Sequence, residues 1–220
     1  LGMVQLGLAR RPTELAGLQA CAALGQPSLM EAWQHALKEC GLAAAQILLT
    51  REDVRGRRRH LAVRTTLEKL LSYGAIPVVN ENDTVSADEI RFGDNDVLAA
   101  LVASLLKADL LVILSTIPGL MRDQGAGELI PVVEEITPEI EAAAGGPRDT
   151  RSTGGMVTKL EAARLATQSG CGMFIGNAAE EDILLKIREG SARGTFFVPQ
   201  ALSLAAKKRW IAFFERPRGA

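Results

Sequence analysis

The sequence has few of the side chains that mark nucleic-acid or transition-metal proteins. Aromatic residues make up only 4% of the 220 residues, which argues against base stacking. The net charge is -1, so no overall field attracts nucleic acid or an acidic membrane surface. The two histidines, His35 and His60, lack partners at ligand spacing, and we expect both to be structural or exposed. The sequence therefore predicts no nucleic-acid partner and assigns no residue as a metal ligand. The Asn and Asp side chains clustered at 80–83 and 94–96 suit a small zwitterion or a hard cation such as Mg²⁺ better than a transition metal.

Cysteines and long apolar runs are also scarce. The three cysteines show no CxxC spacing and cannot all pair within one chain, which favours a reducing compartment and a cytoplasmic location. No apolar run is long enough to span a bilayer, and no secretory segment opens the sequence, so no membrane association is expected. Hydrophobic residues still make up 47%, which is enough for a substantial core, and 220 residues suit one large domain or one domain plus a fragment of another.

The apolar segments alternate between helical and strand patterns. Helices are predicted at 13–24, 28–39, 61–72, 156–169 and 182–189, with one more that Asp94 can cap. Strands are predicted at 45–49, 76–79, 110–114, 171–175 and 195–198. This alternation is typical of a mainly parallel sheet covered on both faces. The basic run Arg57–Arg59 between predicted elements is interpreted as a solvated loop.

A cluster of amides and carboxylates follows the predicted strand at 76–79. It contains Asn80 and Asp83, and then Asn95 and Asp96 at a second acidic turn. Open α/β sheets bind ligands at the carboxyl ends of their strands. Asp83 could pair with an ammonium group, and the two amides could each donate and accept hydrogen bonds. Two Asx-rich turns and a helix cap explain the same residues equally well.

A second candidate site lies where the predicted helix at 156–169 begins. Gly154 and Gly155 allow close approach of a ligand to the backbone, and the helix N-terminus favours an anion. Lys159, one turn into the helix, could add a positive charge. On this segment alone, an ordinary glycine turn with a surface lysine is the favoured interpretation. The run Ser115–Leu120, after the strand at 110–114, could line a nucleotide or simply form a turn, and the turn is the favoured interpretation of this run alone.

Three motifs taken together resemble a known family. They are the runs 79–85, 92–96 and 153–163, with support from 23–26, 48–53 and 208–212. In this order they closely resemble the glutamate 5-kinases of the amino acid kinase superfamily. The resemblance implies a three-layer α/β/α sandwich with a mainly parallel central sheet. Residues 1–200 would form the kinase domain, and 201–220 a linker toward a PUA domain that the sequence does not contain.

The resemblance also implies an activity. It is the ATP-dependent phosphorylation of the side-chain carboxylate of L-glutamate, the first step of proline biosynthesis, with ATP and Mg²⁺ as cofactors. It further implies a homo-oligomer, and proline as a feedback inhibitor is common in such enzymes.

The family motifs also suggest roles for individual residues. Asp83 and Asn95 would hold glutamate with Asn80 nearby, and Asp96 would orient the catalytic lysines. Lys159 would bridge the phosphates. The nucleotide contacts implied are Ser115, Thr116, Thr153, Gly154, Gly155, Met156, Val157, Thr158 and Lys159.

The chain departs from the family pattern at two places. The family's first strand, with its lysine, and a Ser-Ser-Gly-Ala loop are not found, so we expect a fragment that is inactive as it stands. Thr116 stands where the common form has Asp, which bears on the adenosine contacts. Two alternatives remain open: a related kinase for another carboxylate, such as aspartate or N-acetylglutamate, and a non-catalytic module that binds an amino acid or a nucleotide.

Overall fold

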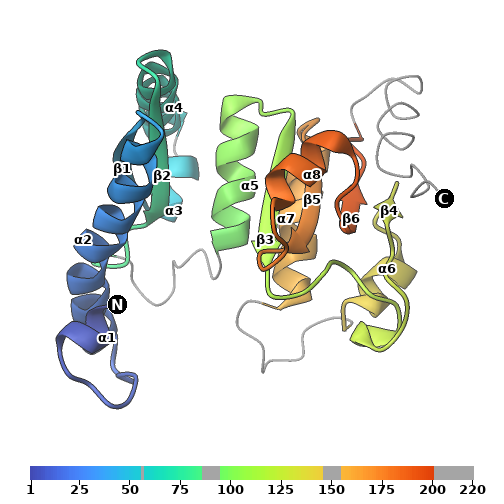
Figure 1. The fold of residues 1–220 in the computed structure, drawn as a ribbon, viewed down its shortest axis with the longest axis horizontal. Coiled ribbons are helices and arrows are strands. Elements are labelled where there is room, and N and C mark those ends of the chain that lie inside the picture. The colour runs from blue at the N-terminus through green and yellow to red at the C-terminus, as the bar shows by residue number, and fades with distance from the viewer. Residues whose placement is uncertain (56, 86–94, 146–154, 201–220) are drawn as a thin grey trace. The chain divides into compact units, whose positions relative to one another are not determined.

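The computed structural model describes residues 1–55, 57–85, 95–145 and 155–200, and it divides into two compact units (Figure 1). These units are Leu1–Asn95 and Asp96–Ala220. The first contains α1 (Gly2–Gln5), α2 (Leu15–Glu39), β1 (Ala43–Leu49), α3 (Arg51–Arg55), α4 (Arg57–Ser72) and β2 (Ala75–Glu81). From the boundary onward follow α5 (Asn95–Leu106), β3 (Leu110–Ser115), η2 (Asp123–Gly125), β4 (Val132–Val133), α6 (Pro138–Ala143), α7 (Met156–Gln168), β5 (Gly172–Asn177), α8 (Ile183–Glu189) and β6 (Gly194–Phe197).

The first unit is built on a parallel pair of strands. In β1 and β2, Ala43 lies opposite Ala75 and Leu49 opposite Glu81, so both strands end at the same edge. The backbone N–H of Asn82 donates to the carbonyl of Leu49 at 2.8 Å and continues the pairing past the end of β2. Helix α2 packs on β1 and α4 packs on β2. The Asx-rich segment after β2 thus begins at the carboxyl edge of this sheet, as the sequence predicts.

Helix α2 is one continuous helix, although the sequence predicts two with a break at residues 25–27. Pro27 lies inside it. Proline removes one backbone donor and normally kinks or ends a helix, so a local rule predicts a break here. Tertiary packing opposes that rule. A Cβ on Gly2 would lie 1.8 Å from the Cys21 carbonyl oxygen, and one on Gly25 would lie 2.8 Å from the Gly2 nitrogen. Helix α1 therefore lies directly against α2 at Cys21 and Gly25, and Gln5 of α1 donates from Nε2 to Ser28 Oγ, just after Pro27, at 2.5 Å.

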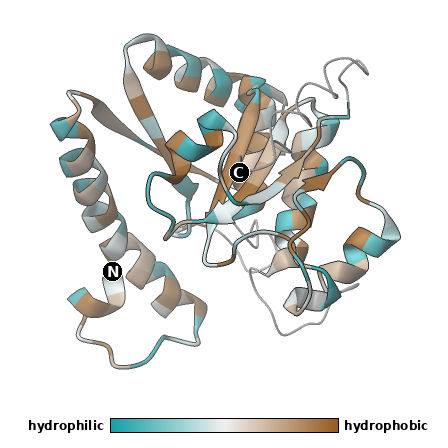
Figure 2. Cartoon of the chain, turned by 45° about the vertical axis from the view of Figure 1, so that its right-hand side comes forward, coloured by the Kyte–Doolittle hydropathy of each residue, from teal (hydrophilic) through white to brown (hydrophobic). Residues whose placement is uncertain are grey.

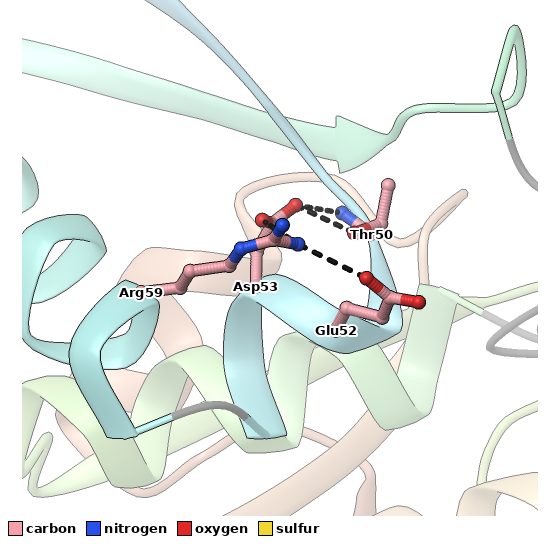
Figure 3. A network of polar contacts seen from close by, with 4 residues as sticks. All are labelled: Thr50, Glu52, Asp53 and Arg59. Atoms are coloured by element: carbon pink, nitrogen blue, oxygen red, sulfur yellow. Dashed lines mark hydrogen bonds and ion pairs between the residues drawn. The ribbon is translucent and has the colours of Figure 1, made fainter.

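The run Arg57–Arg59 is not a loop, contrary to the interpretation from sequence, because it forms the first turn of α4. Figure 3 shows Arg59 reaching back to α3, where its Nη1 lies 3.0 Å from Glu52 Oε2 and 3.5 Å from Asp53 Oδ1. Asp53 Oδ2 accepts hydrogen bonds from the backbone N–H of Thr50 at 2.8 Å and from its hydroxyl at 2.6 Å. This is one half of a capping box at the start of α3. These acidic partners compensate the positive charge of Arg59 at the start of a helix.

The Asp53 network makes a testable contribution to stability. Burial tends to raise the pKa of the Asp53 carboxyl, but the Thr50 hydrogen bonds and the Arg59 charge outweigh it and hold the pKa below its ordinary value of 3.8. A lowered pKa in the folded state means that the stabilisation is present above the unfolded-state pKa and is lost as the pH falls through the folded-state pKa. We expect Asp53→Ala to lower the unfolding free energy by about 1 kcal/mol near neutral pH.

The measurement is thermal unfolding of wild type and variant at about pH 7 and about pH 3. The difference in midpoint should shrink at the acidic pH. Glu68→Ala is the control, because it removes only an exposed pair between Glu68 and Arg64 on α4 and should change little. A difference for Asp53→Ala that stays constant across the pH range would contradict a contribution from the ionised carboxylate.

The second unit is built on a four-stranded sheet in the order β3-β5-β6-β4. The pair β3/β5 is parallel, as the strand–helix alternation predicts, and β4, a strand that the sequence did not predict, is parallel to β6. The pair β5/β6 is antiparallel, which the alternation does not predict. Three of the four pairings between described strands are parallel, so the sheets of this part of the chain are mainly parallel.

Both faces of this sheet are covered. Met173 and Ile175 of β5 join a core cluster with residues of α5 and α7, whereas Phe174 joins a second cluster with Ile183 and Ile187 of α8. Neighbouring side chains of a strand point to opposite faces, so α5 and α7 cover one face and α8 covers the other. Figure 2 shows these strands coloured toward the hydrophobic end of the scale. The second unit is therefore a three-layer α/β/α arrangement.

Candidate functional site

A buried ion pair lies at the centre of the candidate site in the second unit. Lys159 Nζ lies 2.7 Å from Asp96 Oδ2, and only 9% and 14% of the two side chains are exposed. Asp96 is in the first turn of α5, and Lys159 is one turn into α7. The sequence suggested this pairing only through the family resemblance. A buried lysine next to a single carboxylate is a positive charge fixed in place rather than a freely moving surface group.

The lysine faces a pocket of about 480 Å³. Ser115 and Thr116 from the end of β3, together with Gly155 and Met156 at the start of α7, also line it. Gly155 is the N-cap residue of α7, and in the part of the chain that the structure describes no side chain caps this helix end. Uncapped N–H groups and the helix dipole favour an anion here. The pocket therefore combines a helix N-terminus, a buried cation and space for a ligand.

The predicted nucleotide-contacting residues fall into three groups. Ser115, Thr116, Gly155, Met156 and Lys159 all line this pocket. Val157 and Thr158 are half-buried on α7, where the Thr158 hydroxyl donates to the Gly155 carbonyl at 2.8 Å. Thr153 and Gly154 lie outside the described residues.

The sequence identified one wall of this pocket and missed another. The run Ser115–Leu120, which the sequence suggests could line a nucleotide, does line the pocket together with Met121. Ala143 and Ala144 at the end of α6 form a wall that the sequence did not identify. Helix α6 itself was not predicted. Its signal was available, because Thr137 is the N-cap residue and Pro138 occupies the first helical position, a combination typical of helix starts.

The predicted substrate residues Asn80 and Asp83 lie in the first unit. Asn80, near the end of β2, donates from Nδ2 to Gln26 Oε1 on α2 at 3.1 Å. Asp83 lines a second pocket, of about 250 Å³, together with Arg11 and Gln19. One acidic and one basic side chain in a small polar pocket suit a zwitterion. The sequence did not identify Arg11 or Gln19, and it singled out Gln26 only as part of the run 23–26.

Asn95 is exposed and is the first residue of α5, directly before Asp96. The amide is therefore accessible at the helix start, and its proposed contact with substrate stays a prediction. Asp94, which the sequence suggests as the cap of this helix, lies outside the described residues, as do the other residues from 86 to 94.

Within the described ranges, no group of three or more His, Cys, Asp or Glu side chains could hold a metal ion. Among the helices of those same ranges, none has the length and apolarity needed to cross a bilayer.

Comparisons with known proteins agree with this geometry. A family model for the amino acid kinase family matches residues 2–177. The chain is 47% identical to a glutamate 5-kinase of Syntrophotalea carbinolica over 99% of its own length and 60% of that protein. It is 48% identical to a glutamate 5-kinase of Myxococcus xanthus over 100% of its own length and 59% of that protein. The chain thus spans about 60% of the length of these curated relatives.

Solved structures support the fold. The crystal structure of an isopentenyl phosphate kinase substrate complex matches with a TM-score of 0.59 at 18% identity, over 89% of this chain and 77% of that one. A UMP kinase from Ureaplasma parvum matches with a TM-score of 0.54 at 10% identity, over 89% and 75% of the two chains. The predicted fold class, an α/β/α sandwich with a mainly parallel sheet, is confirmed.

Proposed function

Because the chain belongs to the amino acid kinase family, we propose that the full-length protein transfers the γ-phosphoryl group of ATP to the side-chain carboxylate of L-glutamate. The product is L-glutamyl 5-phosphate, which would place the reaction at the start of proline biosynthesis. The observation that carries the proposal is the pairing of Lys159 with Asp96 near the N-terminus of α7, where Lys159 lines a pocket of about 480 Å³. The resemblance of nearly the whole chain to glutamate 5-kinases supports the choice of substrate.

The reaction requires positioning and charge neutralisation more than proton transfer. A glutamate side chain has a reference pKa of about 4.3 and is already ionised, so no general base is needed. One carboxylate oxygen forms a bond to the γ-phosphorus. The bond from that phosphorus to the β–γ bridging oxygen breaks, and ADP leaves with the electron pair. The difficulty is the approach of one anion to another, which fixed positive charges and oriented N–H groups reduce.

Residues of the second unit provide that environment in this proposal. Lys159 neutralises charge on the phosphates, and Asp96 holds the ammonium group of Lys159 in place. The N–H groups at the start of α7 bind phosphate oxygens. Magnesium would be held chiefly by the phosphates themselves, as Mg²⁺ commonly is, since the described residues offer no cluster of metal ligands. When bound, it would neutralise further charge on the triphosphate.

Residues of the first unit recognise the amino acid in this proposal. Asp83 pairs with the α-ammonium group, and the amides of Asn80 and Asn95 supply directed hydrogen bonds. The pocket that Asp83 shares with Arg11 offers charges of both signs to a zwitterion. The cytoplasmic location, the homo-oligomeric state, feedback by proline and the assignment of 1–200 as the kinase domain with 201–220 as a linker remain predictions from the sequence.

The test is a substrate panel with the full-length protein, Mg-ATP and hydroxylamine, which traps acyl phosphates as hydroxamates. We expect hydroxamate from L-glutamate and little from L-aspartate or N-acetyl-L-glutamate. The acetylated compound lacks the ammonium group that Asp83 is proposed to bind. A preference for N-acetyl-L-glutamate would contradict the role of Asp83. Nucleotide and glutamate binding without hydroxamate from any of the three would contradict the kinase assignment and favour the non-catalytic module.

A further inference from the structure

The buried hydroxyl of Thr195 lies behind the wall of the pocket in the second unit. Thr195 is in β6 and is completely buried. Its Oγ1 accepts a hydrogen bond from the backbone N–H of Leu120 at 2.8 Å and donates one to the carbonyl of Ile130 at 2.7 Å. Leu120 belongs to the segment Ser115–Met121, and every residue of that segment lines the pocket. The threonine itself does not line the pocket.

The two hydrogen bonds of the Thr195 hydroxyl replace one backbone hydrogen bond of a short antiparallel pairing. Met121 pairs with Leu129, and the N–H of Ile130 donates directly to the Leu120 carbonyl at 2.8 Å. In a regular antiparallel pair the two residues exchange both hydrogen bonds. Here the second bond of the exchange, from the Leu120 N–H to the Ile130 carbonyl, does not form directly. The Thr195 hydroxyl lies between the two groups, accepts from the N–H and donates to the carbonyl. The hydroxyl therefore holds the strand-like segments at 120 and 130 together and fixes both to β6.

The neighbouring glycine shows how closely the segment approaches β6. Gly119 has φ +148°, a conformation that side chains rarely adopt. A Cβ at this position would lie 2.6 Å from Thr195 Oγ1 and 2.8 Å from Leu129 Cδ1. The backbone at 119 therefore rests directly on the threonine, which has no room to move toward the loop. The position of the pocket wall depends on a side chain from a distant strand.

We infer that Thr195 is a positioning residue for nucleotide binding, holding the wall formed by 115–121 in the shape that accepts the phosphates and nucleoside of ATP. This inference rests on the proposed function for the identity of the ligand, whereas the anchoring itself rests only on the contacts of Thr195. Removing the hydroxyl leaves the Leu120 N–H and the Ile130 carbonyl without their partner inside the protein. A buried polar group without a hydrogen-bond partner costs free energy, and movement of the segment 115–121 reduces that cost.

The experiment compares Thr195→Val, Thr195→Ser and Thr167→Val in the full-length protein. Thr167 is the matched control, since it is also buried in the second unit, and its hydroxyl donates to the Ala163 carbonyl of its own helix at 2.8 Å, away from the pocket wall. Binding of Mg-ADP is measured by calorimetry, and the KM for glutamate is measured in the hydroxamate assay. We expect Thr195→Val to weaken Mg-ADP binding about tenfold, with the KM for glutamate changed much less.

The serine variant retains the hydroxyl and should bind Mg-ADP within about twofold of wild type. Equal loss of affinity in Thr195→Val and Thr167→Val would overturn the inference, because it would indicate a general cost of removing a buried hydroxyl. So would an equal rise in the KM for glutamate. If Thr195→Val does not fold, amide exchange in the wild type decides the anchoring. The Leu120 amide should be strongly protected, and rapid exchange would contradict the anchor.

The proposed function and the role of Thr195 are contradicted by different results. Absence of Mg-ADP binding by the wild type would contradict the proposed function and with it the ligand named for this pocket. Mg-ADP binding by the wild type with no difference between the two valine variants would contradict the role of Thr195 alone.

Discussion

Replacing Lys159 by methionine should lower kcat for glutamate phosphorylation by about 10²–10³-fold in the full-length protein, the scale of losing one oriented group that stabilises transition-state charge. Methionine keeps most of the length of the lysine stem but has no charge. The buried Lys159 ammonium would be the group that offsets negative charge on the phosphates as the carboxylate approaches. The measurement is the steady-state rate of hydroxamate formation with saturating glutamate and Mg-ATP.

The same substitution removes the ammonium group that lies 2.7 Å from Asp96, so it should also lower stability. The double variant Asp96→Asn, Lys159→Met separates the two effects. Removing both charges should recover much of the lost unfolding midpoint, because the carboxylate that faced the Lys159 ammonium is removed together with it, yet the rate should stay low. Recovery of the rate along with the midpoint would mean that Lys159 acts only in folding, contrary to the proposed mechanism.

Replacing Asp83 by asparagine should raise the KM for L-glutamate by about 10²-fold, the scale of losing one partner of a hydrogen-bonded charge pair. The substitution keeps the size of the side chain and removes its negative charge from the pocket that also contains Arg11. Because the nucleotide is proposed to bind in the second unit, its affinity should hardly change. The measurement is the pair of KM values, for glutamate and for Mg-ATP, with the same enzyme preparation.

Asp109→Asn is the control for this change, since Asp109 is an exposed aspartate just before β3 and lines neither pocket. It should leave both KM values near those of the wild type. If Asp83→Asn left the KM for glutamate unchanged, Asp83 would be a turn residue, as the alternative interpretation of the Asx-rich segment holds.

Local patterns in the sequence identified the long periodic elements and the residues near the candidate sites. The apolar run at 110–114 is β3, and the helical spacing at 156–169 is α7. Lys159 and Gly155 could be singled out because a glycine-rich helix start has a local signature. The pairing of Lys159 with Asp96 could not, since 63 residues separate the two and no local rule connects them.

The errors and omissions have the same physical origin. Pro27 predicts a helix break from backbone chemistry alone, whereas packing of α1 against α2 keeps the helix continuous. The antiparallel direction of β6 follows from how the chain returns after α8, which strand periodicity does not encode. Thr195 looks like an ordinary strand residue in the sequence, and its role emerges only when Leu120 and Ile130 are seen on either side of its hydroxyl. Long-range contacts decided each of these features.

The central claim is that a side-chain carboxylate oxygen of glutamate attacks the γ-phosphorus of ATP. The most direct test uses L-glutamate labelled with ¹⁸O in its side-chain carboxylate, with Mg-ATP, hydroxylamine and the full-length protein. Hydroxylamine cleaves the acyl phosphate at its carbonyl carbon, so the released phosphate should carry one ¹⁸O atom from glutamate, visible by ³¹P NMR. Phosphate that contains no ¹⁸O from glutamate would show that water, not the carboxylate, receives the phosphoryl group, and would contradict the account.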